Sequence, residues 1–143
     1  AVPRDIWEPR IKDANILFFG GVDPYHLMHW IQESGLKEIL PRLLTNRVYV
    51  GSSAGSIVAT HSLFTATLDP KEYKDEQALS FVNFHISPHF NSPLMSSITK
   101  EYLEKIANEL HEPFYAIDDQ TAIKVVNGKI EIISEGEYLE FNV

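Results

Sequence analysis

A serine flanked by small residues is the strongest candidate for chemistry in this sequence. Residues 51–55 read Gly-Ser-Ser-Ala-Gly, which fits the G-x-S-x-G pattern of a nucleophile elbow with Ser53 at its centre. Such an elbow exposes the serine hydroxyl on a sharp strand-to-helix turn, where glycines permit close backbone approach. A Gly/Ser-rich turn can equally be a plain connection or a phosphate-binding loop, so the motif alone leaves these alternatives open.

A serine hydroxyl becomes a good nucleophile only when a base removes its proton. Six histidines could supply that base: His26, His29, His61, His85, His89 and His111. His29 and His111 fall on a predicted helix and at a helix end, and we interpret them as structural or solvent-exposed. His85 and His89 have the spacing of a metal-binding pair, but Pro88 prevents the helix on which that spacing would converge, so we expect no metal there.

A catalytic histidine is commonly oriented by a carboxylate. Asp69 follows the predicted elbow helix, whereas Asp118 and Asp119 follow a predicted strand. Acidic residues in turns are usually caps or solvated loop residues, so residue type does not choose among the three.

The composition bounds the class of protein. With 143 residues, 44% of them hydrophobic, the chain predicts one domain with a real core. The net charge of -8 argues against a nucleic-acid partner, and the absence of cysteine excludes disulfides, zinc-thiolate sites and a cysteine nucleophile. No apolar run is long enough for a membrane span and the N-terminus lacks a signal-peptide core, so we expect a cytoplasmic protein without a membrane partner.

The pattern of apolar residues predicts strands that alternate with helices. Strands are expected at 15–19, 47–50, 79–86, 114–117, 121–126, 129–134 and 138–142, and helices at 25–35, 36–44, 55–63 and 96–110. Residues 1–13 are interpreted as a connection with a short helix near Trp7, and Asn127-Gly128 predicts a type I′ hairpin turn. The fold class that follows is α/β, a three-layer sandwich with a mainly parallel sheet and an antiparallel C-terminal hairpin.

Three blocks together resemble the peptidase E family, the S51 serine peptidases, which have a class I glutamine amidotransferase-like fold. Residues 18–27 read Phe-Phe-Gly-Gly-Val-Asp-Pro-Tyr-His-Leu, residues 50–56 Val-Gly-Ser-Ser-Ala-Gly-Ser, and residues 87–90 Ser-Pro-His-Phe. The family has a glycine-rich loop after a strand, a G-x-S-A-G elbow and an N-P-H-F-type segment that carries the catalytic histidine. All three occur here in that order, and the resemblance extends over residues 13–134.

The resemblance implies a role for individual residues. It implies Ser53 as the nucleophile, His89 as the general base, and the backbone N–H groups of Gly21 and Ala54 as the oxyanion hole. The acid that it implies is Asp69, although the alignment can slip by one residue onto Leu68. Asp23, Tyr25, Asn91 and Asp119 are expected near the substrate, and the resemblance implies neither a cofactor nor a metal.

The sequence also departs from the family in three places. Val22-Asp23-Pro24 replaces the family's Gly-Asn-Thr, which stiffens the loop, removes a backbone donor and adds a carboxylate. Residues 91–95 contain no cation, and Lys71, Lys74 and Lys100 are poor substitutes for the arginine expected of an aspartyl dipeptidase. The family's opening β-α units are missing before Ala1, so we expect an N-terminally incomplete domain whose sheet is completed by a missing segment or a second chain.

The function predicted is hydrolysis of short peptides, including N-terminal Asp-X dipeptides, by a Ser-His-acid triad with an acyl-enzyme intermediate. One alternative is a catalytically silent binding or regulatory homologue that keeps the elbow as architecture. The other is a related acyl hydrolase, either cyanophycinase-like or an esterase, with the same triad and a different pocket.

Overall fold

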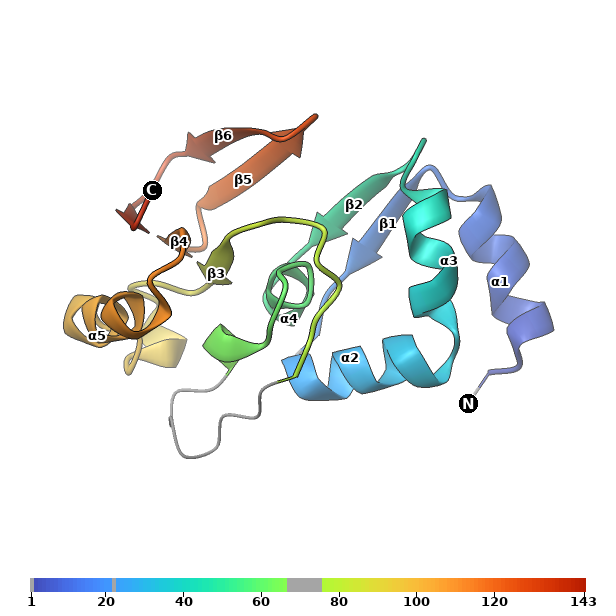
Figure 1. The fold of residues 1–143 in the computed structure, drawn as a ribbon, viewed down its shortest axis with the longest axis horizontal. Coiled ribbons are helices and arrows are strands. Elements are labelled where there is room, and N and C mark those ends of the chain that lie inside the picture. The colour runs from blue at the N-terminus through green and yellow to red at the C-terminus, as the bar shows by residue number, and fades with distance from the viewer. Residues whose placement is uncertain (1, 22, 67–75) are drawn as a thin grey trace.

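The computed structural model of this chain describes residues 2–21, 23–66 and 76–143. Helices and strands alternate in its N-terminal part, and its C-terminal part is rich in strands (Figure 1). The two termini lie toward opposite ends of the long axis, with α5 far from α1 and α3. The architecture is mixed α/β, as the sequence predicts.

The N-terminal part builds a small parallel sheet and its flanking helices. Its elements are α1 (Arg4–Asp13), β1 (Ile16–Phe19), α2 (Pro24–Glu33), α3 (Leu36–Leu43), β2 (Val48–Gly51) and α4 (Ala54–Ile57). β1 and β2 pair in parallel. Apolar side chains of α2 and α3, among them Met28 and Leu40, pack with Leu17 of β1 in one core cluster. This core supports the strand that leads into the serine motif.

The C-terminal part contributes the strand that precedes His89. Its elements are η1 (Phe64–Ala66), β3 (His85–Ser87), η2 (Pro93–Met95), α5 (Lys100–Leu110), β4 (Phe114–Ile117), β5 (Thr121–Val126), β6 (Lys129–Ser134) and β7 (Tyr138–Phe141). β4 pairs in parallel with β3 and antiparallel with β7, while β5 and β6 form a hairpin. Asn127 and Gly128 have φ of 52° and 77°, which confirms the predicted type I′ turn. Within the described ranges the strands form three separate hydrogen-bonded sheets.

Two predicted elements are shorter in the structure because they bind each other. The predicted helix 55–63 stops at Ile57, and the predicted strand 79–86 shrinks to the three residues of β3. The backbone N–H groups of residues 79–81 donate to the carbonyls of residues 58–60 at 2.8–2.9 Å. These two irregular segments therefore satisfy one another's backbone groups, and neither extends its neighbouring helix or strand.

The two outer helices also differ from the prediction. α5 starts at Lys100, and not at Ser96 or Ser97, because the Thr99 hydroxyl caps it by accepting from the Tyr102 N–H at 3.2 Å. The segment interpreted as a connection forms the ten-residue helix α1, in which Glu8 pairs with a basic residue on either side at i±4 spacing.

One face of the β1–β2 sheet is apolar and exposed. Exposed fractions are 61% for Ile16, 68% for Phe18, 57% for Val48 and 37% for Val50. These alternate along the strands with Leu17, Phe19 and Tyr49, which face the core side. Completion of the sheet by another segment or chain stays a prediction. None of the helices in the described ranges has the length and hydropathy of a membrane span.

Candidate active site

The serine motif forms a tight turn between β2 and α4 that leaves no room for larger residues at its two glycines. A Cβ on Gly55 would lie 1.9 Å from the Phe19 carbonyl oxygen, and one on Gly51 would lie 2.5 Å from the Gly55 oxygen. Ser53 itself has φ 54° and ψ -120°, a backbone conformation that non-glycine residues rarely adopt. Positions 51 and 55 therefore require glycine because no Cβ fits there. The strained backbone conformation of the turn is that of Ser53.

The turn is anchored to the end of β1. The Ser52 N–H donates to the Phe19 carbonyl at 2.8 Å, and the Tyr49 hydroxyl donates to the Gly55 carbonyl at 2.6 Å. The Tyr49 ring stacks on Phe19 with centroids 4.8 Å apart. Burial raises the pKa of the Tyr49 hydroxyl, which keeps it protonated as a donor. Both strands of the parallel pair therefore hold Ser53 in place.

The Ser53 hydroxyl faces an imidazole, which in turn faces a carboxylate. Ser53 Oγ lies 2.9 Å from His89 Nε2, and His89 Nδ1 lies 2.7 Å from Asp119 Oδ1. The first distance is within the hydrogen-bond reach that a nucleophile and its general base require. When Nδ1 donates its proton to the carboxylate, Nε2 carries the lone pair that accepts the serine proton. The His89 side chain is 27% exposed, so the ring is partly accessible to solvent.

The fold brings His89 and Asp119 together because they follow adjacent parallel strands. β3 and β4 pair in the same direction, so the loops after them leave from the same edge. The Phe90 N–H donates to the Ile117 carbonyl at 3.0 Å, which ties the two loops directly. His89 has a positive φ of 67°, so the loop turns sharply at the histidine.

Asp118 holds the turn that presents Asp119. Its carboxylate accepts from the Gln120 N–H at 3.0 Å, from the Thr121 hydroxyl at 2.7 Å and from the Glu137 N–H. Burial raises the pKa of the Asp118 carboxyl, but the three hydrogen bonds together lower it more, and the net shift is downward. A Cβ on Gly136 would lie 2.0 Å from this carboxylate. Asp118 is thus a structural anchor, and its neighbour faces His89.

The acid predicted from the family resemblance, Asp69, lies outside the described residues. Within the described part of the chain, the carboxylate found on His89 belongs to Asp119, which the sequence placed among the substrate contacts. The loop Asp118-Asp119 was recognised as a source of an acid, but two adjacent aspartates carry no sequence signal that tells the anchor from the histidine partner.

The other residues expected near the substrate have local structural partners. Asp23 caps α2, because its carboxylate accepts the His26 N–H at 2.7 Å. Pro24 occupies the first turn of α2, where a missing N–H costs no helical hydrogen bond. Asn91 donates its side-chain amide to Glu137, and half-buried Tyr25 lines a groove with His29 of α2.

The two residues expected to form the oxyanion hole follow β1 and β2. Ala54 is the first residue of α4, and Gly21 follows β1 with φ 146°. Among the described residues, neither N–H has a backbone acceptor. Free N–H groups at the start of a helix carry partial positive charge beside Ser53.

A second polar cluster was missed by sequence reasoning. Glu112 Oε2 lies 2.7 Å from His85 Nε2 and 3.2 Å from His61 Nε2. Burial lowers the pKa of His85 although its hydrogen bond to Glu112 opposes this. The three residues come from distant parts of the chain, so no local motif could have found them. His85 and His89 have the spacing of a metal-binding pair in the sequence, but in the structure they belong to two different clusters.

Most of this chain matches known proteins. The family model of peptidase family S51 matches residues 2–133. The chain is 30% identical over 136 residues to the probable alpha-aspartyl dipeptidase of Drosophila melanogaster and 27% identical over 133 residues to a peptidase E of Nostoc sp. strain PCC 7120. These alignments cover 90% and 86% of this chain but 57% and 54% of the relatives, so the chain spans little more than half of their length.

Solved structures show the same fold. A crystal structure of a protein assigned as a peptidase E from Listeria monocytogenes EGD-e superposes with a TM-score of 0.77 at 20% identity, covering 95% of this chain and 67% of that one. A peptidase structure from an acI-B1 actinobacterium gives a TM-score of 0.63 at 20% identity, covering 97% and 64%.

Proposed function

Because the chain belongs to peptidase family S51, we propose that it is a serine peptidase that hydrolyses short peptides through an acyl-enzyme. The observation that carries this proposal is the continuous hydrogen-bond path from Ser53 to His89 to Asp119, with distances of 2.9 Å and 2.7 Å. The serine stands on an elbow whose glycines cannot accept a Cβ.

Acylation begins when His89 Nε2 takes the Ser53 proton and Oγ attacks the scissile carbonyl carbon. The C=O bond opens to an oxyanion, which accepts hydrogen bonds from the N–H groups of Gly21 and Ala54. The intermediate collapses, the C–N bond breaks, and the proton on Nε2 passes to the leaving amine. Ser53 is left as an ester of the N-terminal part of the substrate.

Deacylation repeats the same steps with water. His89 removes a proton from water, the hydroxide adds to the ester carbon, and the second oxyanion occupies the same donors. Collapse breaks the C–Oγ bond and returns the proton to Ser53. Throughout both halves, Asp119 holds the Nδ1–H of His89 and stabilises the imidazolium that forms.

We propose Asp119 as the acidic member of the triad, since it is the described carboxylate in contact with Nδ1. Its side chain is 59% exposed, so water screens its attraction for the imidazolium. The carboxylate therefore acts mainly by fixing the orientation and tautomer of the ring.

The substrate class we propose is short peptides, with Asp-X dipeptides as the first group to be tested because of the Drosophila relative. The loop at residues 91–95 contributes no cation for an aspartyl side chain. Substrate choice therefore has to be measured against neutral dipeptides.

The decisive experiment is labelling of the intact protein with a fluorophosphonate probe, followed by peptide mass mapping. We expect an adduct on Ser53 and none on the Ser53→Ala variant, with Ser52 as the internal control for unspecific serine labelling. Absence of the adduct, together with no turnover of any substrate, would mean that the elbow is architecture in a silent homologue.

A substrate panel then separates the remaining alternative. Asp-X, Glu-X and neutral dipeptides are compared with a simple ester by kcat/KM. A preference for a dipeptide supports the peptidase, whereas turnover of the ester alone assigns a different acyl hydrolase to the same triad.

A further inference from the structure

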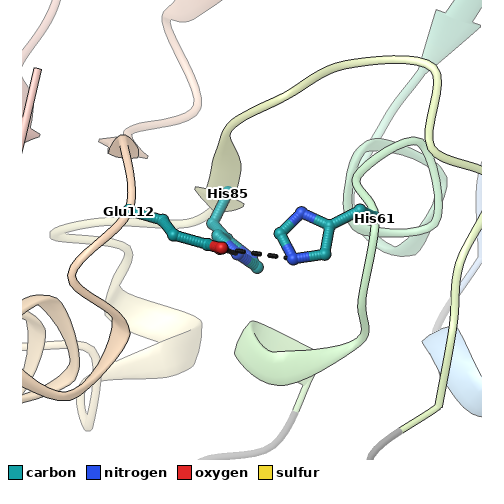
Figure 2. A group of neighbouring side chains, drawn as sticks. All are labelled: His61, His85 and Glu112. Carbon is teal, nitrogen blue, oxygen red and sulfur yellow. Dashed lines mark hydrogen bonds and ion pairs between the residues drawn. The ribbon is translucent and has the colours of Figure 1, made fainter.

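The second polar cluster joins three segments that are far apart in the chain. His61 follows α4, His85 begins β3, and Glu112 lies between α5 and β4; all three side chains point toward one another (Figure 2). Their ligand-type atoms lie within 4.8 Å of one another. Both Nε2 atoms converge on the same carboxylate oxygen, at 2.7 Å and 3.2 Å.

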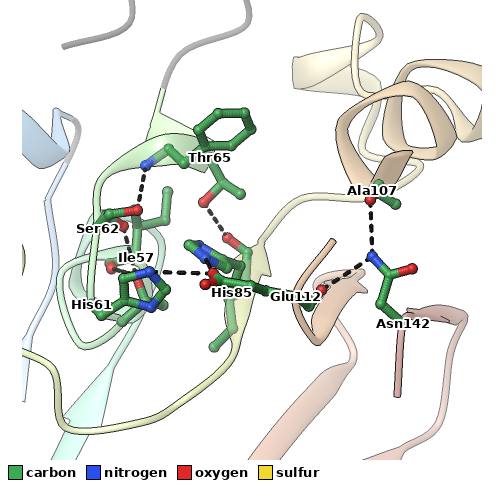
Figure 3. A network of polar contacts seen from close by, with 11 residues as sticks. Ile57, His61, Ser62, Thr65, His85, Ala107, Glu112 and Asn142 are labelled. Carbon is green, nitrogen blue, oxygen red and sulfur yellow. Dashed lines mark hydrogen bonds and ion pairs between the residues drawn. The ribbon is translucent and has the colours of Figure 1, made fainter. Parts of the chain in front are cut away.

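The backbone beneath His85 and Glu112 is fixed by hydrogen bonds. The His85 N–H donates to the Pro113 carbonyl at 2.8 Å, which sets β3 beside Glu112. The buried Thr65 hydroxyl donates to the carbonyl of Ile86 at 2.6 Å, and the Asn142 amide donates to the Glu112 carbonyl at 3.2 Å (Figure 3). The arrangement is therefore held by the fold and not by the three side chains alone.

The donor set has the chemistry of a divalent metal site. Neutral imidazole nitrogens and a carboxylate oxygen are common zinc ligands, and two histidines with one glutamate leave a coordination position open. A tetrahedral ion with bonds near 2.0–2.1 Å separates its ligands by about 3.3 Å. Small side-chain rotations reach this spacing, because His61 and Glu112 are 42% and 48% exposed.

His85 supplies the rigid ligand. Its side chain is fully buried, and its Nδ1 has no hydrogen-bond partner within the described structure. If the His85 ring were charged, Nδ1 would also carry a proton, and this buried N–H would have no acceptor. Burial therefore favours the neutral ring, the form that coordinates a metal.

We propose that His61, His85 and Glu112 bind one zinc-class divalent cation, with solvent completing its coordination. The ion links the segment after α4 to β3 and to the start of β4. Because β3 carries His85 four residues before His89, the bound ion stabilises the strand from which the His89 loop departs. Metal binding by these three residues does not require the proposed peptidase activity.

The test is calorimetric titration of the chelator-treated full chain with ZnCl₂, repeated with CoCl₂ while visible absorption is recorded. We expect one ion per chain, Co²⁺ absorption bands of tetrahedral or five-coordinate type, and a melting temperature that rises with free metal. His61→Gln and Glu112→Gln should each weaken the binding about tenfold or more.

Matched controls are His29→Gln and His111→Asn, which remove exposed histidines outside the cluster. His111 has φ 54°, a conformation that asparagine accepts. Both controls should bind the ion as the wild type does. The proposal is overturned if wild-type protein binds no Zn²⁺, if Glu112→Gln binds it equally well, or if a control variant abolishes binding; the first outcome leaves an ion-pair cluster only.

Discussion

Two histidines at the ends of one short strand occupy opposite environments. His85 begins β3 and is fully buried, with one ring nitrogen against Glu112 and the other without a partner in the described chain. His89 stands two residues after β3 and is partly exposed, with Ser53 on one nitrogen and Asp119 on the other. One residue type thus meets two different sets of partners within five positions.

The difference shows that surroundings assign the role. A general base must reach a substrate and exchange a proton, which requires exposure and a partner on each nitrogen. A rigid ligand needs a neutral ring and a fixed backbone, which burial provides. Neither property can be read from the histidine itself.

The largest expected effect comes from removing the base. His89→Gln should lower kcat/KM by about 10⁵-fold or more, because Ser53 then has no proton acceptor. Hydrolysis of the preferred dipeptide measures this, and circular dichroism checks that the fold survives. If the variant kept more than about a tenth of the activity, His89 would not be the general base. The difference in role between His89 and His85 would then not hold.

A smaller loss is expected from the acid. Asp119→Asn should reduce kcat by about 10²- to 10⁴-fold, because the amide no longer fixes the imidazole tautomer. Glu131→Gln, which alters an exposed carboxylate paired with Lys124, is the control. Asp69→Asn is measured beside it, and a greater loss there than at Asp119 would transfer the role to Asp69.

The turn that carries Ser53 can be disrupted without changing His85 or His89. Gly55→Ala should lower the free energy of unfolding by about 3 kcal/mol or more, because its Cβ would overlap the Phe19 carbonyl. Denaturant titration measures this. Gly128→Asn is the comparison, since a Cβ there meets open space and only the left-handed φ is unfavourable, so a smaller loss of about 1 kcal/mol is expected. Equal stability of both variants would contradict the packing account.

Replacement of the buried histidine should matter less. His85→Leu should change the free energy of unfolding by only about 1 kcal/mol in metal-free buffer. The lost contact with Glu112 is offset by removal of a buried nitrogen without a partner. A loss above about 3 kcal/mol would show that the buried ring has a stabilising role of its own.

The smallest effect concerns acid pH. The pKa of Asp118 is lowered in the folded state, so its stabilising contribution is complete above the ordinary value of 3.8 and is lost as pH falls through the lower folded value. Wild-type stability should therefore fall faster than that of Asp118→Asn as the pH drops below 3.8, as measured by urea unfolding. Parallel curves would show that Asp118 is no anchor for the turn that carries Asp119.

The sequence predicted the parts of the site that depend on local pattern. Gly51 and Gly55 around Ser53 indicated a crowded turn, and the structure shows that crowding. The Asn127-Gly128 hairpin was predicted for the same reason, since its turn chemistry is contained in two residues.

The remainder depends on contacts between distant segments. Strand β3 is short because residues 79–81 bind the carbonyls after α4, which overrides their strand-like composition. The roles of Asp118 and Asp119 differ because three hydrogen-bond donors surround the Asp118 carboxylate, which leaves Asp119 to contact His89. The pairing of β3 with β4 brings His85 beside Glu112, and His61 reaches them from the segment after α4. Such contacts between distant segments are invisible in a single sequence.

The outer face of β1 and β2 makes the colloidal behaviour of this chain depend on salt. The face presents Ile16, Phe18, Val48 and Val50 to solvent, whereas the net charge of -8 makes copies of the chain repel one another. The range of that repulsion shrinks from about 10 Å at 0.1 M salt to about 3 Å at 1 M. High salt, which separates proteins that associate through charge, should therefore drive copies of this chain together.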